Sequence, residues 1–186
     1  MLKVNGAKPM GVELNQAPHE KQQWRVIKIL NALLADESVL YTKLRNYHWN
    51  VTDVDFYALF VVFDSQLNEI CAVIDEVAER IRQYGSNVPG TMEEFIRQAH
   101  LSEAPGIYPD AQTMITNLVN DHGAIIGFLC EDIEVLGEKS KDVGIVDLLT
   151  YLLQRHQKMA WMPRTCINER ITARATGTFI NNTISG

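Results

Sequence analysis

The stretch FYALFVVFDSQLNEICAVIDEVAERIRQY, residues 56–84, decides the fold class of this chain. Apolar side chains recur in it every three or four residues, at Phe56, Leu59, Phe63, Leu67, Ile70, Ile74, Val77 and Ile81. This spacing is typical of one face of an α-helix. Gly85 follows directly and favours a helix end. The stretch therefore predicts one amphipathic helix of about 40 Å, at roughly 1.5 Å per residue.

The segments on either side carry further helical patterns. Upstream, an apolar stripe that starts at Trp24 predicts a long first helix ending within 50–53. Downstream lies a connection rich in glycine and proline, which are helix breakers. Inside it the pattern TMEE at 91–94 has the form of a capping box and predicts a short helix over 92–99.

Two more apolar stripes predict a third long helix from Asp110 and a fourth from residue 144 or 145. Four long amphipathic helices with one longer connection are typical of a bundle. We therefore expect an all-α protein: an antiparallel four-helix bundle with a short extra helix in the connection between helices 2 and 3.

The sequence also suggests where the bundle ends. Residues 1–23 are polar and lack periodicity, so they are expected to form a flexible N-terminal tail. The bundle is expected over 24–163, with a kink or a stop at Pro163, because proline inside a helix removes a hydrogen bond. Residues 164–186 are expected to form a C-terminal tail.

The composition is that of a globular, acidic protein. Of the 186 residues, 46% are hydrophobic, and the formal net charge is -6 at pH 7. Proteins that bind nucleic acid with their whole surface usually have a basic balance, so this class is disfavoured. Three cysteines at wide spacing, Cys71, Cys130 and Cys166, predict reduced and mostly buried thiols rather than a disulfide framework.

The location predicted from the sequence is the cytoplasm. Residues 1–23 contain no apolar core of a signal peptide. The longest apolar runs, such as Ala58–Phe63, fall far short of the roughly 20 residues that span a bilayer. We therefore expect no contact with a membrane.

Asp75 and Glu79 are the first candidates for chemistry. They are four residues apart, so on a helix their carboxylates lie on one face, one turn apart. Two carboxylates repel each other unless a cation lies between them, and oxygen ligands suit iron, manganese, magnesium and calcium. The alternative is a solvated acidic face that pairs with Arg80 or Arg82.

Two further side chains could join them. His48 lies in the aromatic motif YHWN at 47–50, and Asp64 lies beside the apolar stripe of the second helix. Either residue alone is weak support, because a histidine beside aromatic residues is more often a hydrogen-bonded, partly buried side chain.

Taken together, these motifs resemble one family. YHWNV at 47–51, FYAL at 56–59, FD at 63–64, IDEVAERI at 74–81 and HQKMAWM at 156–162 are similar to the sequence pattern of the Dps proteins. The resemblance implies ferritin-like subunits that assemble into a hollow dodecamer. It also implies that the cage oxidises ferrous iron, with hydrogen peroxide or oxygen, and stores the ferric mineral inside, which protects against oxidative stress.

The resemblance also implies the ligands. His48 and Asp64 would come from one subunit, and Asp75 and Glu79 from its two-fold partner, with Trp49 close to the iron. His48, Asp75 and Glu79 would carry the catalysis.

One position departs from the family pattern. A second histidine usually follows twelve residues after the first, and Phe60 stands there instead. A hydrocarbon ring cannot ligate iron, so three interpretations remain open. The site works in altered form, it selects another metal such as zinc or manganese, or it is degenerate in a cage kept for its structure.

The resemblance suggests an entry route as well. Acidic residues near the start of the last helix line three-fold pores in this family, and Glu138, Asp142 and Asp147 lie in that region. Rings of carboxylates would concentrate ferrous ions. The alternative is an acidic helix N-terminus, where carboxylates favour the helix dipole in any case.

Two rival functions fit the sequence less well. Many family members coat DNA through basic tails, but residues 1–23 are nearly balanced in charge and 164–186 are only weakly basic. A conventional ferritin would carry paired Glu-x-x-His motifs inside one bundle. Here the third residue after Glu69 is Ala72 and the third after Glu79 is Arg82, so that pairing is not found on the expected helices.

Overall fold

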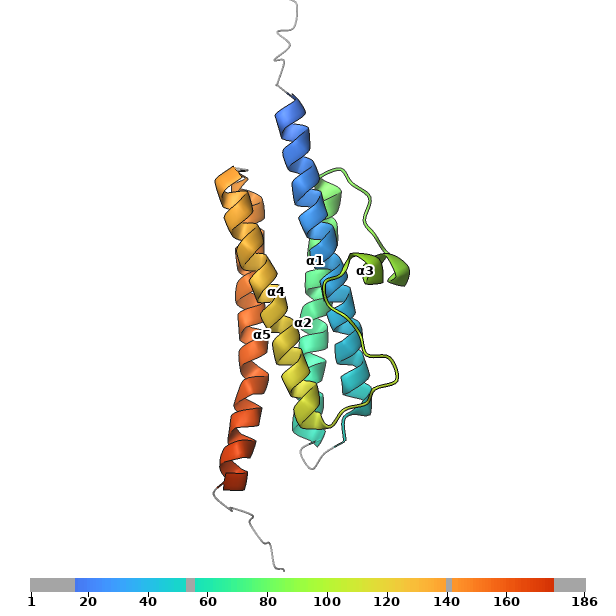
Figure 1. Cartoon of the computed structure of the whole chain (residues 1–186), viewed down its shortest axis with the longest axis vertical. Helices are drawn as coiled ribbons and strands as arrows, with labels where there is room; N and C mark the ends of the chain where they lie inside the picture. The colour runs from blue at the N-terminus through green and yellow to red at the C-terminus, as the bar shows by residue number, and fades with distance from the viewer. Residues whose placement is uncertain (1–15, 53–55, 140–141, 176–186) are drawn as a thin grey trace, which may run out of the picture.

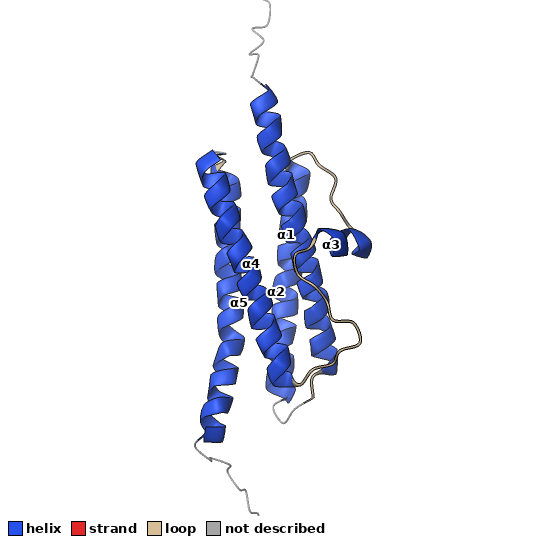
Figure 2. Ribbon diagram, in the orientation of Figure 1, coloured by secondary structure: helices blue, strands red, loops and turns tan. Residues whose placement is uncertain are grey.

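The computed structural model describes residues 16–52, 56–139 and 142–175, with side chains at 16–19, 56, 139 and 164–175 left out. These residues form five helices, in this order: α1 (Gln16–Asn50), α2 (Phe56–Gln83), α3 (Met92–Gln98), α4 (Ala111–Lys139) and α5 (Val143–Ala175). No strand occurs among them, as Figure 2 shows. The predicted all-α class is confirmed.

The four long helices form two antiparallel hairpins that lie side by side (Figure 1). The helices pack most closely within each hairpin, α1 against α2 and α4 against α5. The connection between α2 and α4 returns along the bundle, so these two helices run in the same direction (Figure 1). It carries α3, which packs against α1. This is the predicted four-helix bundle with its extra short helix.

Side-chain caps explain where two of the helices begin. Thr91 and Glu94 form the predicted capping box: the Thr91 hydroxyl accepts from the Glu94 N–H, and the Glu94 carboxylate accepts from the Thr91 N–H at 3.0 Å. Asp110 accepts from the Thr113 N–H at 2.8 Å and starts α4. Each cap satisfies a backbone donor that has no partner inside its helix.

The apolar stripe of α2 lies in the middle of the hydrophobic core. Phe63, Ile70 and Val77 are fully buried. By length and composition alone, α2 is also the helix in the described ranges that could cross a membrane. Its buried stripe accounts for part of this apolar character, because the inner face of a bundle helix requires the same residues.

Helix α1 begins earlier than the sequence predicts. The expected tail over 1–23 is helical from Gln16 onward, and residues 1–15 lie outside the described part of the chain. Pro18 is tolerated because it lies in the first turn, where its missing N–H would have no helical partner. Gln23 donates to the Tyr84 carbonyl at 2.6 Å and ties this end of α1 to the end of α2.

Helix α5 continues through Pro163 to Ala175, so of the two expectations at the proline, a kink or a stop, the stop is wrong. The segment predicted as a tail is thus helical in its first half, and residues 176–186 lie outside the described ranges. Pro163 removes the N–H that the Met159 carbonyl would accept. The side chain of Gln66 supplies a donor to that carbonyl instead, at 2.8 Å.

The predicted burial of the cysteines is wrong for Cys71 and Cys130, which are exposed and unbonded. Each directly follows a buried core residue, Ile70 or Leu129. One step along a helix turns a side chain by about 100°, and here that step leads out of the core. The side chain of Cys166 lies outside the described residues.

Candidate metal site

His48 lies near the end of α1, against the first turns of α2. Its imidazole packs on Phe60, with the ring centroids 4.0 Å apart and the planes tilted by 36°. The side chain is 13% exposed, and neither ring nitrogen has a hydrogen-bond partner among the described residues. A nearly buried imidazole without a partner is unfavourable unless something binds it. His48 is therefore not a core histidine satisfied by hydrogen bonds within the described residues, and its role as a ligand stays a prediction.

Asp64 on α2 faces this imidazole, with 4.0 Å between its Oδ1 and the Nε2 of His48. Ring nitrogens and carboxylate oxygens bind zinc at about 2.0–2.2 Å. At 4.0 Å both atoms can therefore contact a single ion of this size. Phe60 packs against His48 and supplies no lone pair, so this pair offers one nitrogen and one carboxylate as candidate ligands.

Asp75 and Glu79 are both exposed on the outer face of α2. Neither has a hydrogen bond or an ion pair within the described part of the chain. The alternative pairing is not formed, because Arg82 donates instead to the Ser86 carbonyl and the Asn87 side chain. Two carboxylates thus lie one turn apart with no cation of the chain between them.

The neighbouring carboxylate, Glu76, behaves differently. It points toward Arg155 of α5, with 3.9 Å between Oε2 and Nη1. The acidic run on α2 therefore divides into an ion-paired residue and two residues that are free to bind a cation.

One chain brings together only part of the predicted ligand set. Asp64 and Asp75 are separated by about 16 Å along the axis of α2, at roughly 1.5 Å per residue. Over the described ranges, no three His, Cys, Asp or Glu side chains gather in a way that could hold a metal ion. The His48–Asp64 pair and the Asp75–Glu79 pair are thus two separate pairs of candidate ligands on the same chain.

Trp49 follows His48 and is 69% exposed. The guanidinium of Arg45 lies 5.5 Å from the centroid of its ring and 4.8 Å from that of Tyr41. These cation–π contacts hold the indole at the surface next to the imidazole. An exposed aromatic side chain beside His48 is consistent with its expected place near bound metal.

The three acidic residues expected at a pore differ in their surroundings. Glu138 and Asp147 are exposed. Asp142 accepts from the Ile145 N–H at 3.2 Å and from the hydroxyl of Tyr84. Burial, followed by this hydrogen bond and the charge of Asp142, raises the pKa of Tyr84, so its hydroxyl keeps its proton. Asp142 therefore caps α5, and the pore role stays a prediction.

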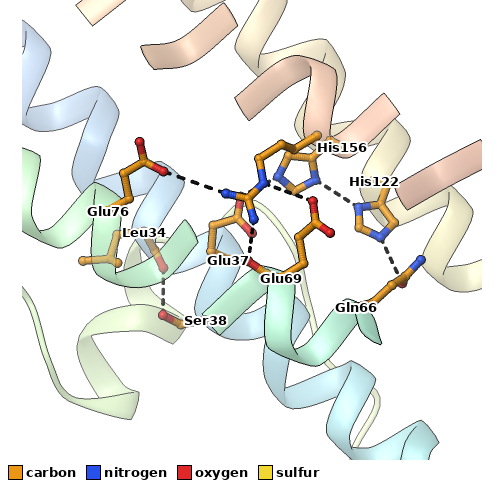
Figure 3. Close-up of polar contacts among 9 residues, drawn as sticks. Leu34, Glu37, Ser38, Gln66, Glu69, Glu76, His122 and His156 are labelled. Carbon is orange, nitrogen blue, oxygen red and sulfur yellow. Dashed lines mark hydrogen bonds and ion pairs between the residues drawn. The ribbon is translucent and has the colours of Figure 1, made fainter. Parts of the chain in front are cut away.

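The bundle contains a buried polar network that the sequence alone does not predict. Glu37, His122 and His156 are each 0% exposed, and Gln66 is 2% exposed. Figure 3 shows them in contact at the centre of the bundle. The two histidines are hydrogen-bonded to each other. One signal was available: Glu37 interrupts the apolar stripe of the first helix.

Comparison with known proteins defines the class. The model of the ferritin-like domain family matches residues 27–171. A DNA protection during starvation protein of Bacillus anthracis is 34% identical over 78% of this chain and 98% of its own length. An uncharacterized low temperature-induced protein of Nostoc is 36% identical over 80% of this chain and 83% of its own.

Solved structures agree. Dps from Staphylococcus aureus has a TM-score of 0.71 and 36% identity, over 77% of this chain and 95% of its own. Dps from Thermosynechococcus elongatus has a TM-score of 0.75 and 28% identity, over 81% and 94% respectively. The fold is that of the ferritin-like proteins. Within them, this chain belongs to the Dps family.

Proposed function

We propose that this protein is an iron-storing mini-ferritin that oxidises ferrous iron at a site shared by two copies of the chain. The observation that carries the proposal is the division of the candidate ligands. His48 with Asp64 forms one half-site, and Asp75 with Glu79 forms the other, too far along α2 to complete it within the same chain. A two-fold axis would place each half opposite the complementary half of the partner, which gives two equivalent sites per pair.

Iron is the substrate at this site. His48 would bind it through the unpartnered Nε2, and the carboxylates would supply hard oxygen ligands and negative charge. Oxidation raises the charge of the ion from +2 to +3, so three carboxylates stabilise the product more than the reactant. With peroxide as the oxidant, two ferrous ions each give one electron to one molecule, which leaves as two waters after taking up two protons.

The wider assembly follows from the family. We propose a hollow homo-oligomer, a dodecamer, in the cytoplasm, with ferric mineral stored inside and carboxylates such as Glu138 and Asp147 near the entry route. Removing ferrous iron together with peroxide would protect the cell against oxidative damage. The relative from Bacillus anthracis is named for DNA protection. The net charge of -6 favours protection of this chemical kind over direct coating of DNA.

Phe60 keeps a second candidate open. A site with one imidazole and three carboxylates has one imidazole fewer than the family pattern, and zinc binds histidine nitrogen together with carboxylate oxygens. We therefore include zinc binding at the same residues as the alternative to iron oxidation.

The deciding experiment measures ferrous oxidation in metal-free protein by ultraviolet absorbance, with peroxide and with oxygen in separate runs. A fast phase that saturates at two sites per pair of chains is expected. A rate equal to that of buffer would contradict the proposal. Calorimetric titration with zinc on the same sample then shows whether the residues bind metal without oxidising it.

A further inference from the structure

Four buried side chains, one from each long helix, form a single hydrogen-bonded chain across the bundle (Figure 3). The Oε1 of Glu37 on α1 is 2.7 Å from the Nε2 of His156 on α5. The Nδ1 of His156 is 2.9 Å from the Nδ1 of His122 on α4. The Nε2 of His122 is 3.5 Å from the Oε1 of Gln66 on α2.

The backbone of α5 fixes the direction of this chain. Gln66 uses its NH₂ group to donate to the Met159 carbonyl, at 2.8 Å, because a carbonyl can only accept. Its Oε1 therefore faces His122 and requires a donor there. The proton of a neutral His122 consequently lies on Nε2, which leaves the Nδ1 of His122 as an acceptor.

The acceptor on His122 sets the state of the next ring. The Nδ1 of His156 must donate to it, since two lone pairs facing each other at 2.9 Å would repel. The contact between His156 and Glu37 then requires a proton of its own, on either the Nε2 or the Oε1. Both placements give the same number of protons. The network holds one proton more than two neutral imidazoles and one ionised carboxylate would hold.

We propose that the core of this bundle is built around one buried, retained proton, which the Glu37 carboxylate balances and which locks the two helical hairpins together. The lock lies between the hairpins because Glu37 and Gln66 belong to the α1–α2 hairpin, while His156 and His122 belong to α4–α5. This inference does not depend on the proposed oxidation of iron.

The charged groups around the network are paired among themselves. On α1, next to Glu37, Asp36 accepts from the ring and the backbone N–H of His100. On α4, Asp121 pairs with Lys43 at 2.6 Å. On α2 and α5, Glu69 pairs with Arg155 at 3.1 Å.

These pairs leave the Glu37 carboxylate as the group that offsets the proton. The pKa of His122 is lowered to about 3 by its burial and by the nearby His156. A neutral His122 agrees with its place as the acceptor. The Oε2 of Glu37 has no partner in the described structure. This costs less when the retained proton makes the Glu37–His156 pair neutral overall than it would for an uncompensated buried charge.

The arrangement suits a proton better than a metal ion. His156 turns one nitrogen to Glu37 and the other to His122, so the three groups follow one another and do not converge on a point. Two imidazole nitrogens bound to one tetrahedral zinc ion at about 2.0 Å would lie roughly 3.3 Å apart, whereas the two Nδ1 atoms are 2.9 Å apart.

The direct test is solid-state NMR of the full-length protein labelled with ¹⁵N-histidine, at pH 8, with His122→Gln and His156→Gln used for assignment. At that pH an ordinary histidine, with a pKa near 6.5, is protonated on both nitrogens in only about 3% of molecules. We expect the Nδ1 of His156 to carry a proton in most molecules and the Nδ1 of His122 to carry none.

An unprotonated Nδ1 on His156 would overturn the proposal. So would metal at one ion per chain in the purified protein, if elemental analysis showed that it is lost in His122→Gln. The first result is read from the wild-type spectrum, and the second compares the metal content of the wild type with that of His122→Gln.

A second measurement uses stability between pH 7.5 and 9. The folded chain keeps a proton that the unfolded chain releases, so the unfolding equilibrium constant should rise by up to about tenfold per pH unit. Glu37→Gln removes the balancing charge and should flatten this slope. Asp36→Asn, which removes the adjacent buried carboxyl, should keep it. Equal slopes in the two variants would contradict the lock.

Discussion

The side-chain amide of Gln66 donates a hydrogen bond of 2.8 Å to the backbone carbonyl of Met159. In an uninterrupted helix that carbonyl would accept from the N–H of residue 163, which Pro163 does not have. A donor on α2 thus replaces the helical bond that α5 lacks. The same amide sets the direction of the histidine chain in the core.

The first prediction concerns this bond. Gln66→Leu should lower the free energy of unfolding by about 1–3 kcal/mol, because it leaves a buried carbonyl without a donor. In the Pro163→Ala background the loss should be smaller, since an alanine at that position supplies its own N–H. A double-mutant cycle by urea unfolding measures the difference. Gln98→Leu, on α3, is the control and should change stability little. Identical losses in both backgrounds would refute the explanation.

The second prediction concerns the exposed carboxylates. Replacing Asp75 with Asn and Glu79 with Gln together should slow ferrous oxidation at least about tenfold, because the half-site loses its charged oxygen ligands. Size-exclusion chromatography should show an unchanged assembly. Glu76→Gln is the matched control on the same helix, since Glu76 faces Arg155, and it should retain the wild-type rate. Unchanged kinetics in the double variant would remove these residues from the site.

The third prediction concerns Phe60. Phe60→His places a second imidazole against His48 and should tighten zinc binding at least about tenfold, as expected for an added nitrogen ligand. Phe60→Leu adds no ligand and should leave the affinity near that of the wild type. Isothermal titration of the metal-free proteins tests both. A Phe60→His variant that binds no more tightly would mean that residue 60 does not reach the metal.

The fourth prediction concerns acid stability. The folded chain holds His122 neutral down to about pH 3, whereas the unfolded chain protonates it below about pH 6.5. The unfolded state therefore binds more protons in this window, and stability falls as the pH falls, by up to about 1.4 kcal/mol per pH unit. His122→Gln should reduce that dependence in urea unfolding at pH 4 and pH 7. A variant with the full wild-type slope would contradict the assignment.

The fifth prediction separates the two interpretations of Asp142. Asp142→Ala removes the cap of α5 and should lower stability by about 1 kcal/mol. Asp142→Asn keeps a capping oxygen, so it should lose less. If Asp142 acts only as a cap, Asp142→Asn should take up iron at the wild-type rate. A slower uptake by this stable variant would instead support a role for its charge in iron entry.

Much of the molecule is predictable from the chain because it depends on near neighbours. The apolar stripe of 56–84 has the period of a helix, and α2 extends from Phe56 to Gln83. The capping box at 91–94 needs only residues three apart, and it forms as expected. Two helix boundaries differ from the sequence prediction: α1 starts earlier, at Gln16, and α5 continues past Pro163. Local helix propensity is weak near both, and a contact from another helix contributes.

The candidate site divides in the same way. The spacing of Asp75 and Glu79 follows from the sequence, because one helical turn fixes it. The 4.0 Å between the Nε2 of His48 and the Oδ1 of Asp64 depends on the packing of α1 on α2. The lack of a partner for Asp75 and Glu79 within the described residues is also known only from the tertiary structure.

The sequence by itself determined the helical bundle, because periodicity, caps and breakers act over a few residues. Only the tertiary structure decided how Glu37, Gln66, His122 and His156 meet, since their partners lie on four different helices. Buried polar groups must find hydrogen bonds wherever the packing places them. That requirement joins the Met159 carbonyl, left unpaired by Pro163, to the buried carboxylate of Glu37 through three side chains that are remote in sequence.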